Sequence, residues 1–348
     1  MKAQVFYGPG DLRLEEVPRP EPGPGEVVLR IDAALTCGTD VKTLRRGHPV
    51  MIPRLPTIFG HEFAGTIAAV GPEVEGVRPG DRAVAANSAP CGACPACRRG
   101  TPNLCDDLLF VNGAYAEYIA LPRRLVAKNL VRVPAAADPV RLAFAEPVAC
   151  CLRALDAAQL APGLPVAVLG HGPLGLLLGL LARAAGARVV LAGKAGPRLE
   201  RARQLGFEAC VDAGAAADPV AAIREAAGGD VRCTIEATGR PEAWEQAIAL
   251  AGKGGTVIFF GGCSPGVTVP LDTRRMHYEE LRLLGVFHHT PGLVRRAVSL
   301  LADGTLDPSP LITHELGLGD VPAALALMSR GEALKVLIRP RPGSEDEA

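Results

Sequence analysis

The sequence predicts a two-domain α/β protein in which a mainly-β unit is combined with a doubly wound parallel sheet. The chain has 348 residues, which is long for a single hydrophobic core. Short apolar runs cut by glycine and proline fill its first third, and alternating strand and helix patterns begin near residue 165. We therefore expect two domains that differ in their secondary structure, one mainly β and one α/β.

The amino-terminal unit is predicted to be barrel-like and built from short strands. Alternating apolar runs bounded by turn residues lie at 27–31, 65–70, 82–85 and 118–121. Near Asp138 the composition changes to Ala- and Leu-rich helical sequence. The β-rich unit is therefore expected to end before the apolar strand at 165–169.

A glycine-rich turn follows this apolar strand and precedes a helix that runs to about residue 185. The segment from Gly170 to Gly175 matches G-x-G-x-x-G, and the next strand is expected at 188–192. The pattern is weak alone, but its place between a buried strand and an amphipathic helix is the one that dinucleotide binding requires. The predicted coenzyme-binding residues of this turn are Gly170, Gly172, Pro173, Leu174 and Gly175.

The carboxyl-terminal part is predicted to return to the amino-terminal unit, because it is too short for a third domain. Helices are expected at 291–302 and 320–329, and a closing strand at 335–338. The predicted domains are 1–150 together with 289–348, and 151–288. The acidic tail from Ser344 to Ala348 is expected to be disordered.

Charge and hydropathy exclude several classes of partner. The chain has 37 basic and 37 acidic residues, so no overall field attracts a nucleic acid or an anionic membrane. The longest apolar stretch, Leu174 to Ala182, is too short to cross a bilayer. With no recognisable leader, we expect a cytoplasmic protein that binds neither nucleic acid nor membrane.

Four closely spaced cysteines predict a structural zinc site in a lobe at about 88–108. Their spacing is C-x2-C-x2-C-x7-C, which can close a tetrahedral thiolate shell within one segment. The alternative is a pair of disulfides, which the expected reducing compartment disfavours. The predicted ligands are Cys91, Cys94, Cys97 and Cys105.

A second metal site is predicted from Cys37, His61 and Glu62. A thiolate, an imidazole and a carboxylate form a three-residue shell with one position open, which is typical of catalytic zinc. The alternative interpretation is a buried apolar cysteine with a core histidine bonded to backbone groups. An open zinc would polarise an alcohol so that hydride can leave toward a nicotinamide.

Taken in order, these motifs resemble the zinc-dependent medium-chain alcohol dehydrogenases, and most closely their polyol (sorbitol) and threonine dehydrogenase branch. The resemblance covers nearly the whole chain and implies a GroES-like catalytic domain, a Rossmann coenzyme domain and a homo-oligomer, a tetramer or dimer. It also implies that Glu146, in Glu146-Pro147, holds the catalytic zinc directly or through water. Two alternatives remain. Glu146 is an ordinary carboxylate at the start of a helix, or Cys150 binds the zinc in its place.

Thr39 and Lys42 are candidates for proton transfer. The Thr39 hydroxyl, two residues after Cys37, can pass a proton from the substrate, although turn capping explains the same residue. The family commonly has histidine at the position of Lys42, so either Lys42 or His48 would end the proton path. Lys42, with Arg45 and Arg46, is also a candidate for holding an anionic or phosphorylated substrate, although a solvated basic face is the better explanation of these three residues.

The end of the second predicted parallel strand indicates NADP rather than NAD. A carboxylate that would bind the adenosine ribose of NAD is missing, and Gly193, Lys194 and Arg198 occur there instead. The two basic residues suit a 2′-phosphate, while a solvated basic helix start would leave NAD as the coenzyme.

The predicted function is zinc-dependent interconversion of a secondary alcohol and a ketone with NAD(P), on a small polyol, sugar or sugar-derived alcohol. We expect two zinc ions per chain, one catalytic and one structural. L-threonine 3-dehydrogenase is the alternative within the fold. A non-catalytic zinc- and nucleotide-binding protein is the alternative from another class, and the open metal site weighs against it.

Overall fold

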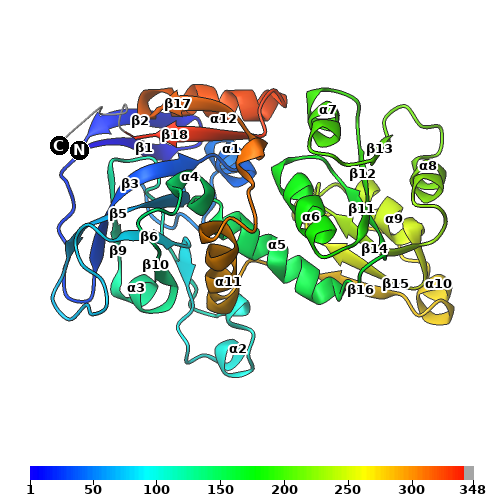
Figure 1. The fold of residues 1–348 in the computed structure, drawn as a ribbon, viewed down its shortest axis with the longest axis horizontal. Coiled ribbons are helices and arrows are strands. Elements are labelled where there is room, and N and C mark those ends of the chain that lie inside the picture. The colour runs from blue at the N-terminus through cyan, green and yellow to red at the C-terminus, as the bar shows by residue number, and fades with distance from the viewer. Residues whose placement is uncertain (341–348) are drawn as a thin grey trace. The chain divides into compact units, whose positions relative to one another are not determined.

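The computed structural model describes residues 1–340 as two compact units (Figure 1). One unit comprises Met1–Ala149 with the carboxyl-terminal part from His289, and the other comprises Cys150–His288. The predicted disordered tail, Ser344 to Ala348, lies outside the described residues. None of the helices in residues 1–340 combines the length and hydrophobicity needed to span a membrane.

The first unit is built mainly from β-strands. A seven-stranded sheet has the order β10-β6-β5-β3-β18-β17, with β9 also paired to β3. Its strands are β3 (Val27–Leu35), β5 (Glu62–Val70), β6 (Arg82–Ala85), β9 (Tyr118–Leu121), β10 (Leu130–Arg132), β17 (Ile312–Gly317) and β18 (Lys335–Arg339). A smaller sheet contains β1 (Lys2–Gly8), β2 (Asp11–Glu16) and β4 (Thr57–Ile58).

The closing strand joins the first unit as the sequence predicts. In β18, Leu337 and Ile338 pair with Leu35 and Ala34 of β3. This pairing places the end of the described chain beside a strand formed about 300 residues earlier, and Thr36 Oγ1 accepts the Val336 N–H at 2.9 Å. Besides α2 (Pro95–Arg98), the helices of this unit are α1 (Gly38–Arg46), α3 (Arg123–Asn129), α4 (Pro139–Leu142), α11 (Pro291–Ala302) and α12 (Val321–Arg330).

Buried aromatic residues form part of the core of the first unit. The rings of Phe6 and Phe59 stack with centroids 5.0 Å apart, and Tyr115 meets Phe59 edge-on at 6.0 Å. All three side chains are almost completely buried. Gly60 follows Phe59 with φ of 86°, and a Cβ there would lie 2.8 Å from the Tyr115 ring, so this position requires glycine.

The second unit contains a six-stranded parallel sheet, which confirms the predicted doubly wound fold. Its order is β13-β12-β11-β14-β15-β16, so it grows in both directions from its first strand. The strands are β11 (Pro165–Leu169), β12 (Arg188–Gly193), β13 (Ala209–Asp212), β14 (Val231–Glu236), β15 (Ala251–Phe259) and β16 (Arg282–Gly285).

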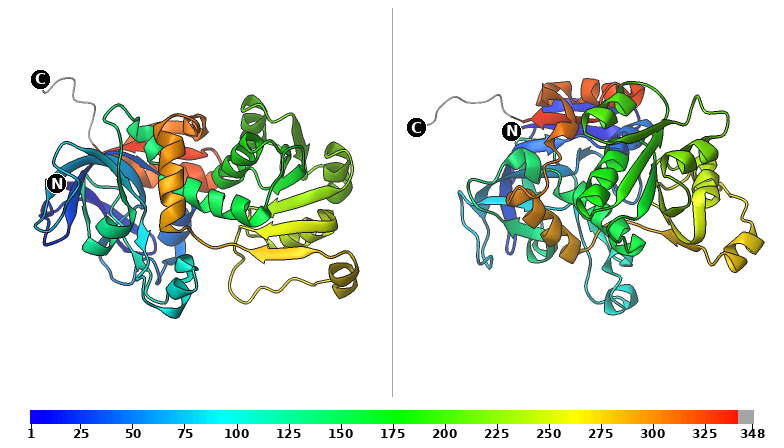
Figure 2. Two further views of the ribbon diagram at one scale, coloured as in Figure 1. Left: turned by 60° about the horizontal axis from the view of Figure 1, so that its bottom comes forward. Right: turned by 45° about the vertical axis from the view of Figure 1, so that its right-hand side comes forward.

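Helices cover both faces of this sheet (right-hand view of Figure 2). The helices of this unit are α6 (Pro173–Ala184), α7 (Pro197–Gln204), α8 (Pro219–Ala226), α9 (Pro241–Leu250) and α10 (Thr273–Tyr278). The chain connects the two units through α5 (Ala145–Ala158). Because β11 is buried on both faces, its sequence is a continuous apolar run with no alternation.

Candidate active site and coenzyme turn

Paired strands bring the three predicted catalytic-site residues together. Leu35, near the end of β3, pairs with Glu62 at the start of β5. Cys37 therefore follows one strand and His61 precedes the other at the same edge of the sheet. The Cys37 Sγ, a ring nitrogen of His61 and a carboxylate oxygen of Glu62 all lie within 4.8 Å of one another, and the three side chains are buried.

Asp40 organises the histidine and the cysteine of this cluster. Its Oδ1 lies 2.9 Å from His61 Nδ1, and its Oδ2 accepts the Cys37 backbone N–H at 2.9 Å. Since Nδ1 faces Asp40, Nε2 is left as the histidine nitrogen for a metal. Burial would lower the pKa of His61, but the Asp40 carboxylate outweighs it and raises that pKa well above its usual range.

Tyr115 supports Asp40 in turn. Its hydroxyl donates to Asp40 Oδ2 at 2.5 Å from inside the core, where it is fully buried. Burial and the Asp40 charge raise the pKa of Tyr115 well above its usual range, so the phenol remains a proton donor. A chain of contacts therefore runs from Tyr115 through Asp40 to His61. The sequence shows Asp40 only as the last residue of Cys-Gly-Thr-Asp, and it gives no sign of Tyr115.

Glu62 is paired with a lysine that sequence reasoning did not identify. Lys335 Nζ donates to Glu62 Oε1 at 2.6 Å and also contacts Oε2, and both side chains are buried. Burial, together with the charge of Glu146, raises the pKa of the Glu62 carboxyl although the Lys335 ammonium opposes this shift. A lysine directly before the apolar run Val336–Leu337–Ile338 of the closing strand is the one available signal in the sequence.

Glu146 lies near the start of α5, beside a histidine. One of its carboxylate oxygens is within 4.8 Å of a ring nitrogen of His289, which is buried. His289 Nε2 lies 3.5 Å from Asn87 Oδ1. Of the residues predicted to hold catalytic zinc, Glu146 is the one that the structure groups with His289 instead of with Cys37 and His61. His289 and Asn87 are polar residues of this region that the sequence analysis missed.

The proton-transfer candidates differ in their exposure. Thr39 is half-buried in the first turn of α1, whereas Lys42 is exposed on the same helix. His48 is half-buried just after α1, and its Nδ1 accepts the Met51 N–H at 3.1 Å. Burial lowers the pKa of His48.

The cysteine lobe brings its four thiols into one cluster within the first unit. The sulfur atoms of Cys91, Cys94, Cys97 and Cys105 lie within 4.8 Å of one another. Backbone N–H groups point at them, including Cys94 N–H to Cys91 Sγ at 3.3 Å and Cys91 N–H to Cys105 Sγ at 3.2 Å. Backbone N–H groups, first that of Cys97 and then that of Asp106, lower the pKa of the Cys94 thiol to about 6, whereas burial raises the pKa of the Cys105 thiol to about 12. Such donors stabilise thiolates, the form that zinc binds.

Short elements frame this lobe: β7 (Ser88–Ala89), α2 (Pro95–Arg98), η1 (Pro102–Leu104) and β8 (Leu109–Phe110). All ten cysteines of the chain are free thiols, and Cys94 Sγ and Cys105 Sγ are 3.8 Å apart. This separation exceeds the ~2.05 Å of a disulfide bond. The arrangement favours a metal site over the disulfide alternative.

The glycines of the coenzyme turn have distinct geometric roles. Gly170 has φ of 115°, and a Cβ there would lie 2.8 Å from Thr238 Cγ2. A Cβ at Gly175 would lie 1.9 Å from the Gly170 carbonyl oxygen, whereas a Cβ at Gly172 would meet nothing within 4 Å. Gly172 is the N-cap of α6 and Pro173 is its first residue. The open space at Gly172 and the helix amino end suit a pyrophosphate.

Lys194 and Arg198 follow β12, at the same edge of the sheet as the turn. Lys194 is exposed, but Arg198 in the first turn of α7 is half-buried, and burial lowers its pKa. Leu174, in the first turn of α6, is also half-buried.

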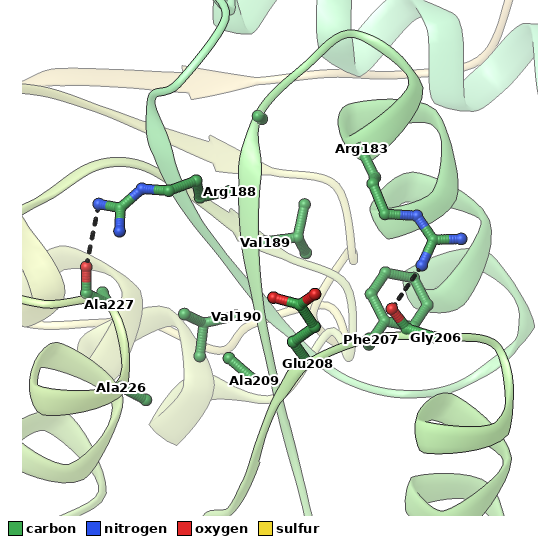
Figure 3. A pocket seen from close by; sticks show the side chains of 11 residues that line it. Arg183, Arg188, Val189, Val190, Gly206, Phe207, Glu208, Ala209, Ala226 and Ala227 are labelled. Carbon is green, nitrogen blue, oxygen red and sulfur yellow. Dashed lines mark hydrogen bonds between the residues drawn. The ribbon is translucent and has the colours of Figure 1, made fainter.

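A cavity of about 330 Å³ lies elsewhere in the second unit (Figure 3). It is lined by Arg188 at the start of β12 and by Ala209 at the start of β13, with Arg183 across from them. Ligands of open α/β sheets bind at the carboxyl ends of the strands. The cavity is at the opposite edge, so we do not assign it to the coenzyme.

Comparisons with known proteins agree with this arrangement. Residues 23–134 match the alcohol dehydrogenase GroES-like domain, and residues 173–303 match the zinc-binding dehydrogenase family. The chain is 30% identical to sorbitol dehydrogenase of Bacillus subtilis over 98% of this chain and 97% of that protein. It is 33% identical to L-threonine 3-dehydrogenase of Bacillus velezensis over 94% and 95% of the two chains.

A solved structure of a zinc-binding dehydrogenase of Sinorhizobium meliloti, bound to NADP, is similar to this chain with a TM-score of 0.90. The two sequences are 34% identical, and the match covers 97% of this chain and 99% of the other. The chain therefore belongs to the zinc-dependent medium-chain dehydrogenases, in their polyol and threonine dehydrogenase branch. It is an oxidoreductase.

Proposed function

We propose that this enzyme catalyses the zinc-dependent, NADP-linked interconversion of a secondary alcohol and a ketone, on a polyol, sugar or sugar-derived alcohol. The observation that carries the proposal is the buried cluster of Cys37, His61 and Glu62. Its thiol, imidazole and carboxylate are ligands of the kinds that zinc binds. Sorbitol dehydrogenase among the relatives supports the choice of substrate class.

Zinc, when bound, would supply Lewis-acid polarisation of the substrate oxygen. Cys37 and His61 would hold it, with Glu62 and Glu146 as the further candidate ligands. Asp40 keeps the His61 ring oriented, with its Nε2 directed away from the carboxylate contact. The four lobe cysteines would hold a second, structural zinc ion. In this assignment, 1–150 with 289–348 is the catalytic domain and 151–288 binds the coenzyme.

Proton transfer would begin at the Thr39 hydroxyl. Of the two candidates for the end of the path, His48 fits better than Lys42. His48 is half-buried and burial lowers its pKa, so that its neutral form can accept a proton near neutral pH once Nδ1 releases the Met51 N–H. Lys42 is exposed on α1.

The coenzyme turn and the basic residues after β12 support NADP. Gly193 carries no carboxylate that would repel a 2′-phosphate, and Lys194 is exposed beside it. The Sinorhizobium meliloti relative was solved with NADP. The resemblance to the family further supports a cytoplasmic homo-oligomer, a tetramer or dimer, that acts on a small molecule.

Threonine is the second candidate substrate, because two of the similar Bacillus proteins are L-threonine 3-dehydrogenases. The missing ribose-binding carboxylate at Gly193 weighs against it, since that activity normally accompanies NAD.

The test is a substrate screen combined with removal of a metal ligand. The screen offers polyols, inositols, sugar phosphates, threonine and simple secondary alcohols with each coenzyme. Cys37→Ser should abolish turnover on the preferred substrate and leave coenzyme binding, measured by titration, largely intact. Cys210→Ser, which changes a half-buried thiol of the other unit, is the matched control and should keep full turnover. Near wild-type turnover by a Cys37→Ser protein shown to lack catalytic zinc would refute the mechanism.

A further inference from the structure

An imidazole occupies the space above Gly193, at the end of β12. If Gly193 had a Cβ, this atom would lie 2.1 Å from Cδ2, 2.5 Å from Nε2 and 2.6 Å from Cγ of His171. Contacts below 3.0 Å essentially never occur for a real Cβ. The side chain of His171 and any side chain at position 193 therefore exclude each other in this arrangement.

His171 is held in this position by a hydrogen bond to the neighbouring strand. It belongs to the glycine-rich turn after β11, and its Nε2 lies 2.7 Å from the Lys194 carbonyl oxygen. A carbonyl oxygen can only accept, so Nε2 carries the proton and donates. The turn is also joined to β12 by the Gly170 N–H, which donates to the Ala192 carbonyl at 2.8 Å.

The second ring nitrogen of His171 is available to a ligand. Among residues 1–340 Nδ1 has no hydrogen-bond partner, and the side chain is only half-buried. A neutral imidazole accepts a hydrogen bond at Nδ1, and a protonated one donates there. In neither form does it carry the negative charge of the acidic residue that usually ends this strand in NAD-binding sheets.

We propose that His171 is a specificity-determining residue of the coenzyme site: its imidazole replaces the acidic side chain and requires glycine at position 193. This inference rests on the proposed dinucleotide-binding function. It also changes what a single substitution at Gly193 can achieve. A carboxylate introduced there must displace His171 from its hydrogen bond with Lys194, so Gly193→Asp alone cannot produce a well-formed NAD site.

The test uses His171→Ala, Gly193→Asp and the double variant in the full-length protein. The dissociation constants of NADPH and NADH are measured by fluorescence titration, and folding is followed by thermal melting. His277→Ala, which removes an exposed histidine of α10, is the control and should change neither constant.

In its protonated form His171 would donate one hydrogen bond from Nδ1 to the 2′-phosphate. We therefore expect His171→Ala to weaken NADPH binding about tenfold, which corresponds to one hydrogen bond of about 1.4 kcal/mol. Gly193→Asp alone should weaken binding of both coenzymes or lower the melting temperature. The double variant should recover the melting temperature and bind NADH at least about tenfold more tightly than Gly193→Asp does.

Two results would overturn this inference. One is a Gly193→Asp protein that binds NADH as tightly as the double variant, and the other is a His171→Ala protein with unchanged constants. A wild-type protein that binds neither NADPH nor NADH would instead refute the proposed function, and the inference would fail with it.

Discussion

Removing the Tyr115 hydroxyl tests whether the contacts behind His61 support the metal site. Tyr115→Phe keeps the ring in its core position against Phe59. It deletes the hydroxyl that donates to Asp40 Oδ2 at 2.5 Å and also lies 3.3 Å from the Leu35 carbonyl oxygen. The Asp40 carboxylate is 2% exposed, so water does not readily replace the lost donor. The Asp40 carboxylate would still accept the Cys37 backbone N–H and would still contact His61.

The expected magnitude follows from the type of bond. A buried hydrogen bond to a charged group contributes about 1.5–3 kcal/mol, so the free energy of unfolding of the first unit should fall by about 2 kcal/mol. For a unit of this size that corresponds to a decrease in melting temperature of about 4–8 °C. Because Asp40 orients His61, we also expect about a tenfold loss of zinc affinity.

Thermal melting and competition with a zinc chelator at fixed pH measure the two effects. Tyr7→Phe is the matched control, since it removes an exposed hydroxyl that donates to Glu15 at 3.1 Å. The control should change the melting temperature by less than about 2 °C. If Tyr115→Phe retains the wild-type melting temperature and zinc affinity, the contact chain from Tyr115 to His61 does not support the site.

Two further predictions concern the cysteine lobe and the coenzyme. Cys94→Ser should remove one zinc ion per chain and lower thermal stability, because the lobe has little hydrophobic core besides the metal. Metal analysis and thermal melting measure these two effects. An unchanged zinc content together with an unchanged melting temperature would exclude a zinc site in the lobe. Lys194→Ala should raise the NADP Michaelis constant by about one to two orders of magnitude, if its side chain forms a charge-assisted bond to the 2′-phosphate, and should affect NAD far less. An unchanged ratio of the NADP and NAD Michaelis constants would show that Lys194 is a solvated surface residue without a role in coenzyme selectivity.

Features that depend on neighbouring residues were predictable from the sequence. The cysteine lobe places four ligands within fifteen residues, and the glycine turn lies directly between β11 and α6. In both cases the spacing itself constrains the geometry, because few backbone conformations are compatible with it. The helix Pro291–Ala302 follows from local periodicity in the same way. The alternation of strands and helices in the second unit likewise indicates a parallel sheet.

Contacts between residues distant in sequence were not predictable. Glu62 and Lys335 are 273 positions apart, and Asp40 and Tyr115 are 75 apart. A single sequence does not show which buried lysine will meet which carboxylate, because strand pairing decides it. Likewise, the sequence shows that a carboxylate is missing at Gly193, but it does not show that the His171 ring lies in that space.

The long-range contacts explain how so many acidic groups can be buried around one site. Asp40 and Glu62 are almost fully buried there, and Glu146 is close enough to influence Glu62. The buried cationic partner of Glu62 is Lys335. Burial raises the pKa of Glu62, whereas at His61 the Asp40 carboxylate outweighs burial and raises the pKa, which marks a deficit of positive charge beside Asp40. A divalent cation would compensate this deficit more completely than protons can, since it satisfies several anionic groups at once. Metal binding at Cys37 and His61 should therefore be coupled to the folding stability of the first unit as well as to catalysis.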